Sequence, residues 1–303
     1  MDRAKNFVII YSGRTGSSPV VNILARQPGV CVPVFEELDH RFIGKARAGE
    51  IDTILDAVYT TGELAGASIR EHLPRFPAGE TPLSIGFKWR PYGDWKKVCA
   101  VFRRHDVMIF VFSRRDLIEV SSSLYITSHG NKLQKEVEIP AHPQFELVRG
   151  IEASRDKVAK LQALTFPVRP RLYHRTMRQQ VRARADLVQL AREAHGYGVP
   201  VRSLYYEDFV ADNAGFIKAM LGEIGVPVPA APDTTSVFEK VMKVPARSRL
   251  RHLDAWLWLP PMRWQMLRYA RTGSDLEEVV AASRAGRVLK PVAVRSEPMK
   301  IRG

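Results

Sequence analysis

A short stretch near the amino terminus combines glycine, arginine and hydroxyl side chains in an order that can bind an anion. The residues Gly13-Arg14-Thr15-Gly16-Ser17-Ser18 follow an apolar run and precede a helical pattern with Pro19 in its first turn. Free N–H groups at a helix start, a Gly-permitted turn, an arginine and hydroxyl donors together form a cradle for phosphate or sulfate. The sequence is not a Walker A motif, GxxxxGK[ST], because the lysine of that motif is absent. It also differs from the dinucleotide-binding motif GxGxxG. An ordinary capped turn between strand and helix is the plainer alternative.

A second basic run follows another apolar segment and predicts a second anion-binding loop. Arg115 and Ser123 lie eight positions apart, so an arginine at a strand end and a serine two turns into the next helix can converge on one anion. Asp116 fits a helix cap better than a catalytic role. The alternative for Arg114 and Arg115 is an ion pair at the edge of a sheet.

Five short apolar segments, rich in β-branched and aromatic residues, predict the strands that must position these loops. Helical patterns alternate with them, which favours a doubly wound α/β domain. We therefore predict a single P-loop-like domain with a central parallel sheet of about five strands flanked by helices. The expected strands are Asn6–Ser12, Val30–Phe35, Leu83–Lys88, Val107–Ser113 and Val199–Tyr205.

The helical patterns define the rest of the domain. Its expected extent is residues 1–284, with an acceptor-facing insertion around 131–171 and a basic tail over 285–303. The segment Leu253–Arg271 mixes Trp, Leu and Arg, and we expect a helix that packs its aromatics into the core, with a membrane-surface helix as the alternative. The other expected helices are Ser18–Gln27, Ile51–Tyr59, Asp94–His105, Leu117–Ser128, Arg175–His195, and Asn213–Gly225 with Asn213 as its N-cap.

Charge is the one unusual feature of the composition. The 303 residues include 46 Lys and Arg against 32 Asp and Glu, a formal net charge of +14, which indicates a polyanionic partner. Two cysteines exclude a disulfide scaffold and a zinc site built from cysteine alone. No signal-peptide pattern or spanning apolar run is present, so we expect a cytoplasmic protein and leave contact with a membrane surface open.

The ordered set of loops resembles the PAPS-dependent sulfotransferases, and most closely their bacterial NodH-like carbohydrate branch. In that family a loop such as Arg14–Ser18 binds the 5′-phosphosulfate of PAPS, and an arginine with a serine eight positions later, as in Arg115 and Ser123, binds the 3′-phosphate. The resemblance runs from about residue 6 to residue 256. Its further matches are Pro33–Leu38 after the second strand, Tyr206–Phe209 after the fifth, and the basic segment Arg247–Arg251, whose Arg249 and Arg251 would bind the nucleotide.

The resemblance implies in-line transfer of a sulfuryl group from PAPS to a hydroxyl, with PAP as product and no metal. Arg14, and Lys88 at the end of the third strand, would stabilise the leaving phosphate. Glu37 is the favoured general base and Glu36 the second choice, because no histidine follows the third strand before His105. A solvated acidic loop is the alternative for both glutamates.

The acceptor implied by the resemblance is a saccharide or glycolipid. Trp89, Tyr92, Trp95 and Tyr125 could stack on sugar rings, although such residues more often belong to a core. Two other function classes stay open. One is another nucleotide-dependent phosphotransferase, disfavoured because the Walker lysine is absent. The other is a nucleic-acid-binding protein, suggested by the basic stretch 175–192 but without an accompanying recognition motif.

Overall fold

A computed structural model of the chain describes residues 4–34, 37–38, 49–64, 76–77, 79–129, 165–235, 245–289 and 299–300. Most of the predicted insertion, and Glu36 with it, lies outside these described residues.

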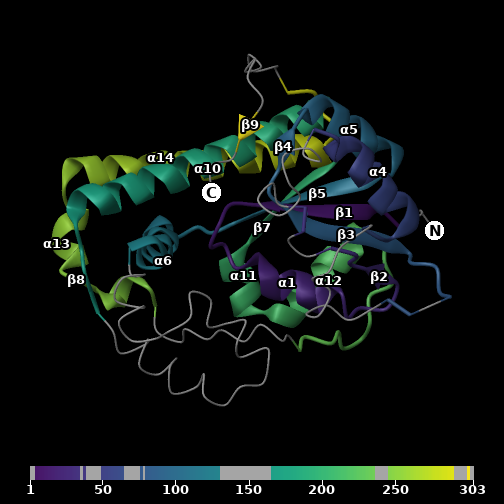
Figure 1. Cartoon of the computed structure of the whole chain (residues 1–303), viewed down its shortest axis with the longest axis horizontal. Helices are drawn as coiled ribbons and strands as arrows, with labels where there is room; N and C mark the ends of the chain where they lie inside the picture. The colour runs from purple at the N-terminus through teal and green to yellow at the C-terminus, as the bar shows by residue number, and fades with distance from the viewer. Residues whose placement is uncertain are drawn as a thin grey trace.

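The centre of the molecule is a parallel sheet of five strands in the order β2-β3-β1-β5-β7 (Figure 1). Each neighbouring pair is parallel, and the central strands are buried on both faces, as continuous apolar runs such as VMIFVFS require. The predicted fold class is confirmed, and each of the five expected strand segments overlaps one strand. Their bounds are β1 Asn6–Tyr11, β2 Val30–Cys31, β3 Ser84–Trp89, β5 Val107–Ser113 and β7 Val201–Tyr205.

The strand order places a topological switch point beside β1. The chain leaves β1 toward β2 and β3 on one side of the sheet, and then crosses to β5 and β7 on the other side. In open α/β sheets, ligands bind in the crevice outside the carboxyl ends of the strands at such a point. The loops that follow β1, β3 and β5 all lie at this edge, and those after β1 and β5 are the two that the sequence singled out.

Helices cover both faces of the sheet and bury two apolar clusters against it (Figure 1). Phe7 and Ile9 of β1 face one cluster, while Val8 and Ile10 face the other, which is the period-two alternation of a strand. The first face is covered by α1 Ser17–Leu24, α11 Tyr206–Ala211 and α12 Asn213–Glu223. The second is covered by α4 Ile51–Thr61, α5 Trp95–Arg104, α10 Pro170–Gly196 and α14 Pro260–Arg284.

A third apolar cluster lies beyond the carboxyl ends of the strands. It joins α6, which follows β5, to the first turns of α10 and α14. A short parallel pair, Phe166 to Leu250 and Pro167 to Arg251, adds to this part of the structure. The elements introduced here are α6 Leu117–His129, β6 Phe166–Pro167, η2 Arg247–Arg249, β8 Leu250–Arg251 and α13 Leu253–Leu257. At the edge of the second face, β4 Tyr92–Gly93 pairs antiparallel with β9 Met299–Lys300.

Two expectations about helix starts are wrong, and local chemistry explains both. Helix α10 begins at Pro170 rather than Arg175, because proline fits the first helical position, where its missing N–H has no partner to lose. The N-cap of α12 is Asp212 rather than Asn213, since Asp212 Oδ1 accepts a hydrogen bond of 2.8 Å from the N–H of Gly215.

The expected burial of the aromatics in residues 253–271 is also wrong. Tyr269 is buried, but Trp256, Trp258 and Trp264 are exposed. The buried side chains of α14 recur at Met262, Gln265, Tyr269, Leu276 and Val280, a spacing that leaves Trp264 on the opposite face.

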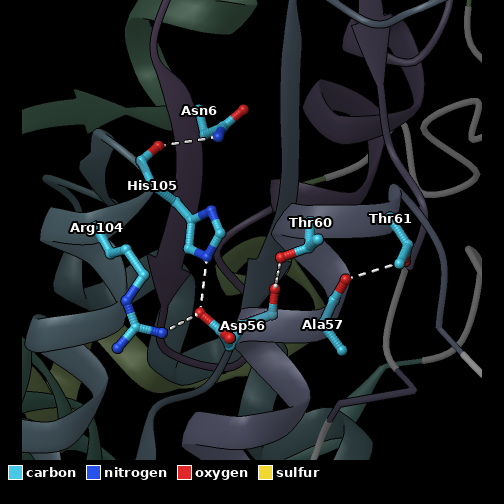
Figure 2. A network of polar contacts seen from close by, with 7 residues as sticks. All are labelled: Asn6, Asp56, Ala57, Thr60, Thr61, Arg104 and His105. Atoms are coloured by element: carbon cyan, nitrogen blue, oxygen red, sulfur yellow. Dashed lines mark hydrogen bonds and ion pairs between the residues drawn. The ribbon is translucent and has the colours of Figure 1, made fainter.

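A polar network fastens α4 to α5 at the amino edge of the sheet, opposite the loops described above. Figure 2 shows the His105 side chain pointing toward Asp56, with Nε2 2.8 Å from Oδ1, and Arg104 Nη1 2.6 Å from the same oxygen. Asn6, the first residue of β1, donates to the carbonyl of His105 at 2.9 Å. Asn6 begins β1 and His105 precedes β5, so His105 lies at the end of the sheet remote from the switch point.

Replacing Asp56 with Asn tests this network. The hydrogen bond with His105, and then Arg104, hold the pKa of Asp56 below its ordinary value, so folding favours the ionised carboxylate. That stabilisation is fully present above the unfolded pKa of about 4 and is lost as pH falls through the lowered folded value. We expect Asp56→Asn to reduce the free energy of unfolding by about 0.5–1 kcal/mol at pH 7.

Denaturant titrations of the wild type and the variant at neutral and acid pH measure this difference. It should shrink below about pH 4, where the wild-type carboxylate also loses its charge. The exposed Glu80→Gln serves as a control with no effect at either pH. A loss for Asp56→Asn that stays constant down to acid pH would contradict the ionic role of the contact.

Candidate functional site

The loop between β1 and α1 adopts the conformation that an anion cradle requires. Gly16 is the N-cap residue of α1 with a φ of 84°, and no side chain caps this helix start. Thr15 fastens the loop from inside, because its Oγ1 donates to the carbonyl of Ser12 at 3.0 Å. Arg14 also has a positive φ, 68°, which is uncommon for a residue with a Cβ. Such strain is frequent at ligand sites.

Lys88 comes to this loop from the end of β3. Its side chain is buried, and Nζ donates a hydrogen bond of 2.6 Å to Ser18 Oγ in the first turn of α1. The ring of Tyr11, at the end of β1, lies 5.4 Å from Lys88 Nζ and 5.4 Å from the guanidinium carbon of Arg90. Two basic side chains from the end of β3 thus lie beside the ring of Tyr11, and the charge of Arg90 also acts on Arg14.

A hydrogen bond joins the loop between β1 and α1 to helix α6. Arg14 Nε donates to Ser123 Oγ at 3.2 Å, although 109 positions separate the two residues. Arg14 reaches solvent, yet its guanidinium is crowded by surrounding protein. This desolvation, followed by the positive charges of Arg114 and Arg90, lowers the pKa of Arg14. Cations held close enough to disfavour one another's charge form a ready site for an anion.

Arg114 is fixed on the same side by its backbone and by an aromatic ring. Its guanidinium carbon lies 3.9 Å from the centre of the Tyr206 ring, a cation–π contact. Its carbonyl accepts hydrogen bonds from Tyr269 Oη at 2.7 Å and from Arg184 Nη1 at 3.4 Å. The end of β5 is therefore tied to α10 and α14, which limits how far Arg114 can move away from Arg14.

Arg115 points to a different partner. Its guanidinium forms a bidentate pair with Asp208 at 2.6 and 2.8 Å and lies 4.0 Å over the ring of Tyr205. Hydrogen bonding to Asp208 is the main cause that raises the pKa of Arg115. Glu207 meanwhile accepts from the backbone N–H of Arg115 at 3.0 and 3.1 Å. The ion pair considered as the alternative for Arg115 is present, while Ser123 contacts Arg14.

The basic segment Arg247–Arg251 begins against the first turn of α6. Glu119 of α6 accepts hydrogen bonds from the backbone N–H groups of Ala246 and Arg247 at 2.9 and 3.2 Å, which fixes the start of η2. Arg249 is buried over the ring of Phe166 at 5.1 Å, and burial lowers its pKa. Arg251 is exposed. Arg249 is thus packed inside the protein beside Phe166, whereas Arg251 faces solvent.

Glu37 is the one of the two candidate bases that the structure describes, and its side chain is 8% exposed. It follows β2 at the carboxyl edge of the sheet, the edge that carries the loops.

Four basic residues, Arg14, Lys88, Arg90 and Arg114, form what we call the cation cluster. The sequence did not single out Arg90 and Arg114 as ligands. Arg90 follows β3 directly, and Arg114 follows β5 directly. Their position one residue past a strand was the available signal, because parallel strands end at a common edge. The choice between adjacent Arg114 and Arg115 depends on which way each side chain turns, which spacing alone does not determine.

Comparison with solved structures finds a structural similarity. A sulfotransferase from Alicyclobacillus acidocaldarius superposes on 92% of this chain and 98% of its own, with a TM-score of 0.46 and 15% sequence identity. No family model matches the chain, and no curated protein matches it. Function is therefore inferred from this chain's own residues.

Replacing Gly16 with Ala tests the geometry of the loop. A Cβ at this position would lie 2.5 Å from Cε2 of Tyr206 and would need the left-handed backbone conformation. We expect Gly16→Ala to lower the free energy of unfolding by about 1–3 kcal/mol, measured by denaturant titration. Gly13→Ala, in the same loop but with open space around its Cβ, is the matched control and should change stability little. Equal effects of the two substitutions would contradict the close packing of Gly16 on Tyr206.

Proposed function

We propose that the protein is a sulfotransferase that moves a sulfuryl group from PAPS to a hydroxyl of an acceptor, leaving PAP. The observation that carries the proposal is the contact between Arg14 and Ser123, which joins the loop after β1 to helix α6 at the switch point of a parallel sheet. A ligand held there meets donors that come from the loop and from the helix. Such an arrangement favours a nucleotide that bears separate anionic groups over one with a single phosphate.

The 5′-phosphosulfate is assigned to the loop of Arg14 and to the first turn of α1. Backbone N–H groups at a helix start bind phosphate oxygens, and Gly16 lets the backbone approach closely. The 3′-phosphate is assigned to Ser123 with Arg115, which the eight-residue spacing pairs. Arg114 is a further donor, because it lies on the Arg14 side, while Arg115 would have to share its fork with Asp208.

The proposed step is an in-line displacement at sulfur. The acceptor oxygen forms a new S–O bond as the bond between sulfur and the bridging phosphate oxygen breaks, so negative charge builds on that phosphate. Arg14 and Lys88 are proposed to stabilise this charge, because Arg14 belongs to the loop that precedes α1 and Lys88 contacts Ser18 in the first turn of that helix. The acceptor proton passes to a base, for which Glu37 is proposed.

A saccharide hydroxyl is proposed as the acceptor on the strength of the NodH-like resemblance. The aromatic residues considered as sugar platforms do not serve that purpose, because Trp89, Tyr92, Trp95 and Tyr125 are all buried. Trp89, Tyr92 and Trp95 pack against one another in the core.

Thermal unfolding with added nucleotides tests the choice of donor. A ligand at one hundred times its dissociation constant stabilises the folded state by about 2.7 kcal/mol, which raises the Tm by about 4 °C for a chain of this size. We expect this rise with PAP and a much smaller one with adenosine 5′-phosphate, ATP, NAD or GTP. A rise with ATP that matches PAP and grows with Mg²⁺ would instead support a phosphotransferase.

The variant Arg14→Gly separates binding from folding in the same assay. Glycine removes the guanidinium but accepts the left-handed backbone of this position, so we expect the unliganded Tm to stay near that of the wild type. The PAP-induced rise should be largely lost. A full PAP response in Arg14→Gly would contradict the assignment of the first loop.

Glu37→Gln tests the proposed base. Transfer of labelled sulfate from PAPS to a panel of saccharides should fall by about 100-fold or more, because the amide cannot accept the proton. PAP affinity, measured by calorimetry, should be unchanged. Glu63→Gln, an exposed residue after α4, is the matched control with normal transfer. Near-normal turnover by Glu37→Gln would remove Glu37 from this role.

A further inference from the structure

Large apolar side chains are exposed on the surface formed by α13, the turn after it and the outer face of α14. Trp258 is 74% exposed, Leu267 66% and Trp264 59%, and Trp256, Leu259 and Met266 are exposed to a smaller degree. We call these six residues the tryptophan patch. Single exposed apolar residues are ordinary, but several large ones on adjoining turns mark a site of interaction.

The charge around the tryptophan patch is almost entirely positive. Arg263, Arg268 and Arg271 are exposed on α14 itself, and Arg251 is exposed just before α13. Arg263 lies over the ring of Trp258, with its guanidinium carbon 5.9 Å from the ring centre. Asp254 is the acidic residue among positions 251–274. The surface therefore combines apolar rings and cations on one side of a helix.

A second basic surface runs beside the patch along the first half of α10. Its exposed arginines are Arg171, Arg175, Arg178 and Arg182, a spacing of four, three and four residues that lines them along one side of the helix. His174 Nε2 lies 3.5 Å from Gln265 Nε2, which places these turns of α10 beside the first turns of α14. Packed helices lie about 8–10 Å apart. This distance does not exceed the Debye length of about 10 Å at 0.1 M salt, so the charges on the two helices act together.

We propose that the tryptophan patch and the arginines around it bind the surface of a membrane that contains anionic phospholipid. Indole rings and aliphatic side chains enter the boundary between headgroups and acyl chains, and arginines pair with lipid phosphates. The charge decides the occupant. A second copy docked through the same face would bring two sets of arginines together, which disfavours a symmetric dimer.

The contact is peripheral. Among the described helices, none combines the length and the apolar character that crossing a bilayer requires. Helix α13, which belongs to this surface, lies on the side of the molecule opposite the amino terminus in Figure 1. Its attachment to the core is firm, because η2, which leads into α13, is fixed to α6 through Glu119. This inference does not depend on the proposed sulfuryl transfer.

Sedimentation of the full chain with lipid vesicles tests the proposal. We expect binding to vesicles of phosphatidylcholine with phosphatidylglycerol, little binding to phosphatidylcholine alone, and a decrease as salt rises. Tryptophan emission should shift to shorter wavelength on binding. Three of the five tryptophans belong to the patch, while Trp89 and Trp95 are already buried.

Matched variants assign the binding to this surface. Trp258→Ser with Trp264→Ser, and separately Arg268→Gln with Arg271→Gln, should each weaken vesicle binding by about tenfold or more. The apolar control is Val228→Ser with Val288→Ser, and the charge control is Lys96→Gln with Lys97→Gln; all four residues are exposed away from the patch. Circular dichroism confirms that each variant is folded.

Three results would overturn the proposal. One is the absence of vesicle binding by the folded wild type, or equal binding to neutral and anionic vesicles. Another is a patch variant that binds as well as its control. The third is a dimer in sedimentation equilibrium that the tryptophan variant converts to monomer, which would assign the patch to a second copy of the chain.

Discussion

The structure depends on holding several cations together at the point where three parallel strands end. Arg14, Lys88, Arg90 and Arg114 follow or end β1, β3 and β5 and lie around one helix start. Like charges in a partly desolvated place repel one another, so this cluster costs stability unless the surrounding structure fixes it. An anionic ligand relieves this repulsion between the cations. The free energy released on relief adds to the affinity for the ligand.

The fixation comes from aromatic rings and from hydrogen bonds to the backbone. Tyr11 lies beside Lys88 and Arg90, and Tyr206 packs on both Gly16 and Arg114. Tyr269 holds the carbonyl of Arg114 from α14. These rings offer their faces to the cations. Next to Arg114 in the sequence, Arg115 pairs with Asp208.

The sheet could be predicted from the sequence because buried parallel strands are continuous apolar runs, and all five were placed correctly. The loops could be predicted as neighbours because parallel strands end at one edge. The direction of single side chains could not. Arg114 and Arg115 have the same residue type at adjacent positions, and only the fold shows that one turns to Tyr206 and the other to Asp208. The aromatics of α14 were misplaced for a related reason, since Trp suits both a core and an interface.

The binding of the nucleotide at the joined loops is tested most directly by a crystal structure of the protein with PAP. The cation cluster predicts a 5′-phosphate within hydrogen-bond distance of the first N–H groups of α1 and of Arg14, with the 3′-phosphate at Ser123. PAP found elsewhere, for example along the arginines of α10, would contradict this central claim and reassign the positive charge of the chain.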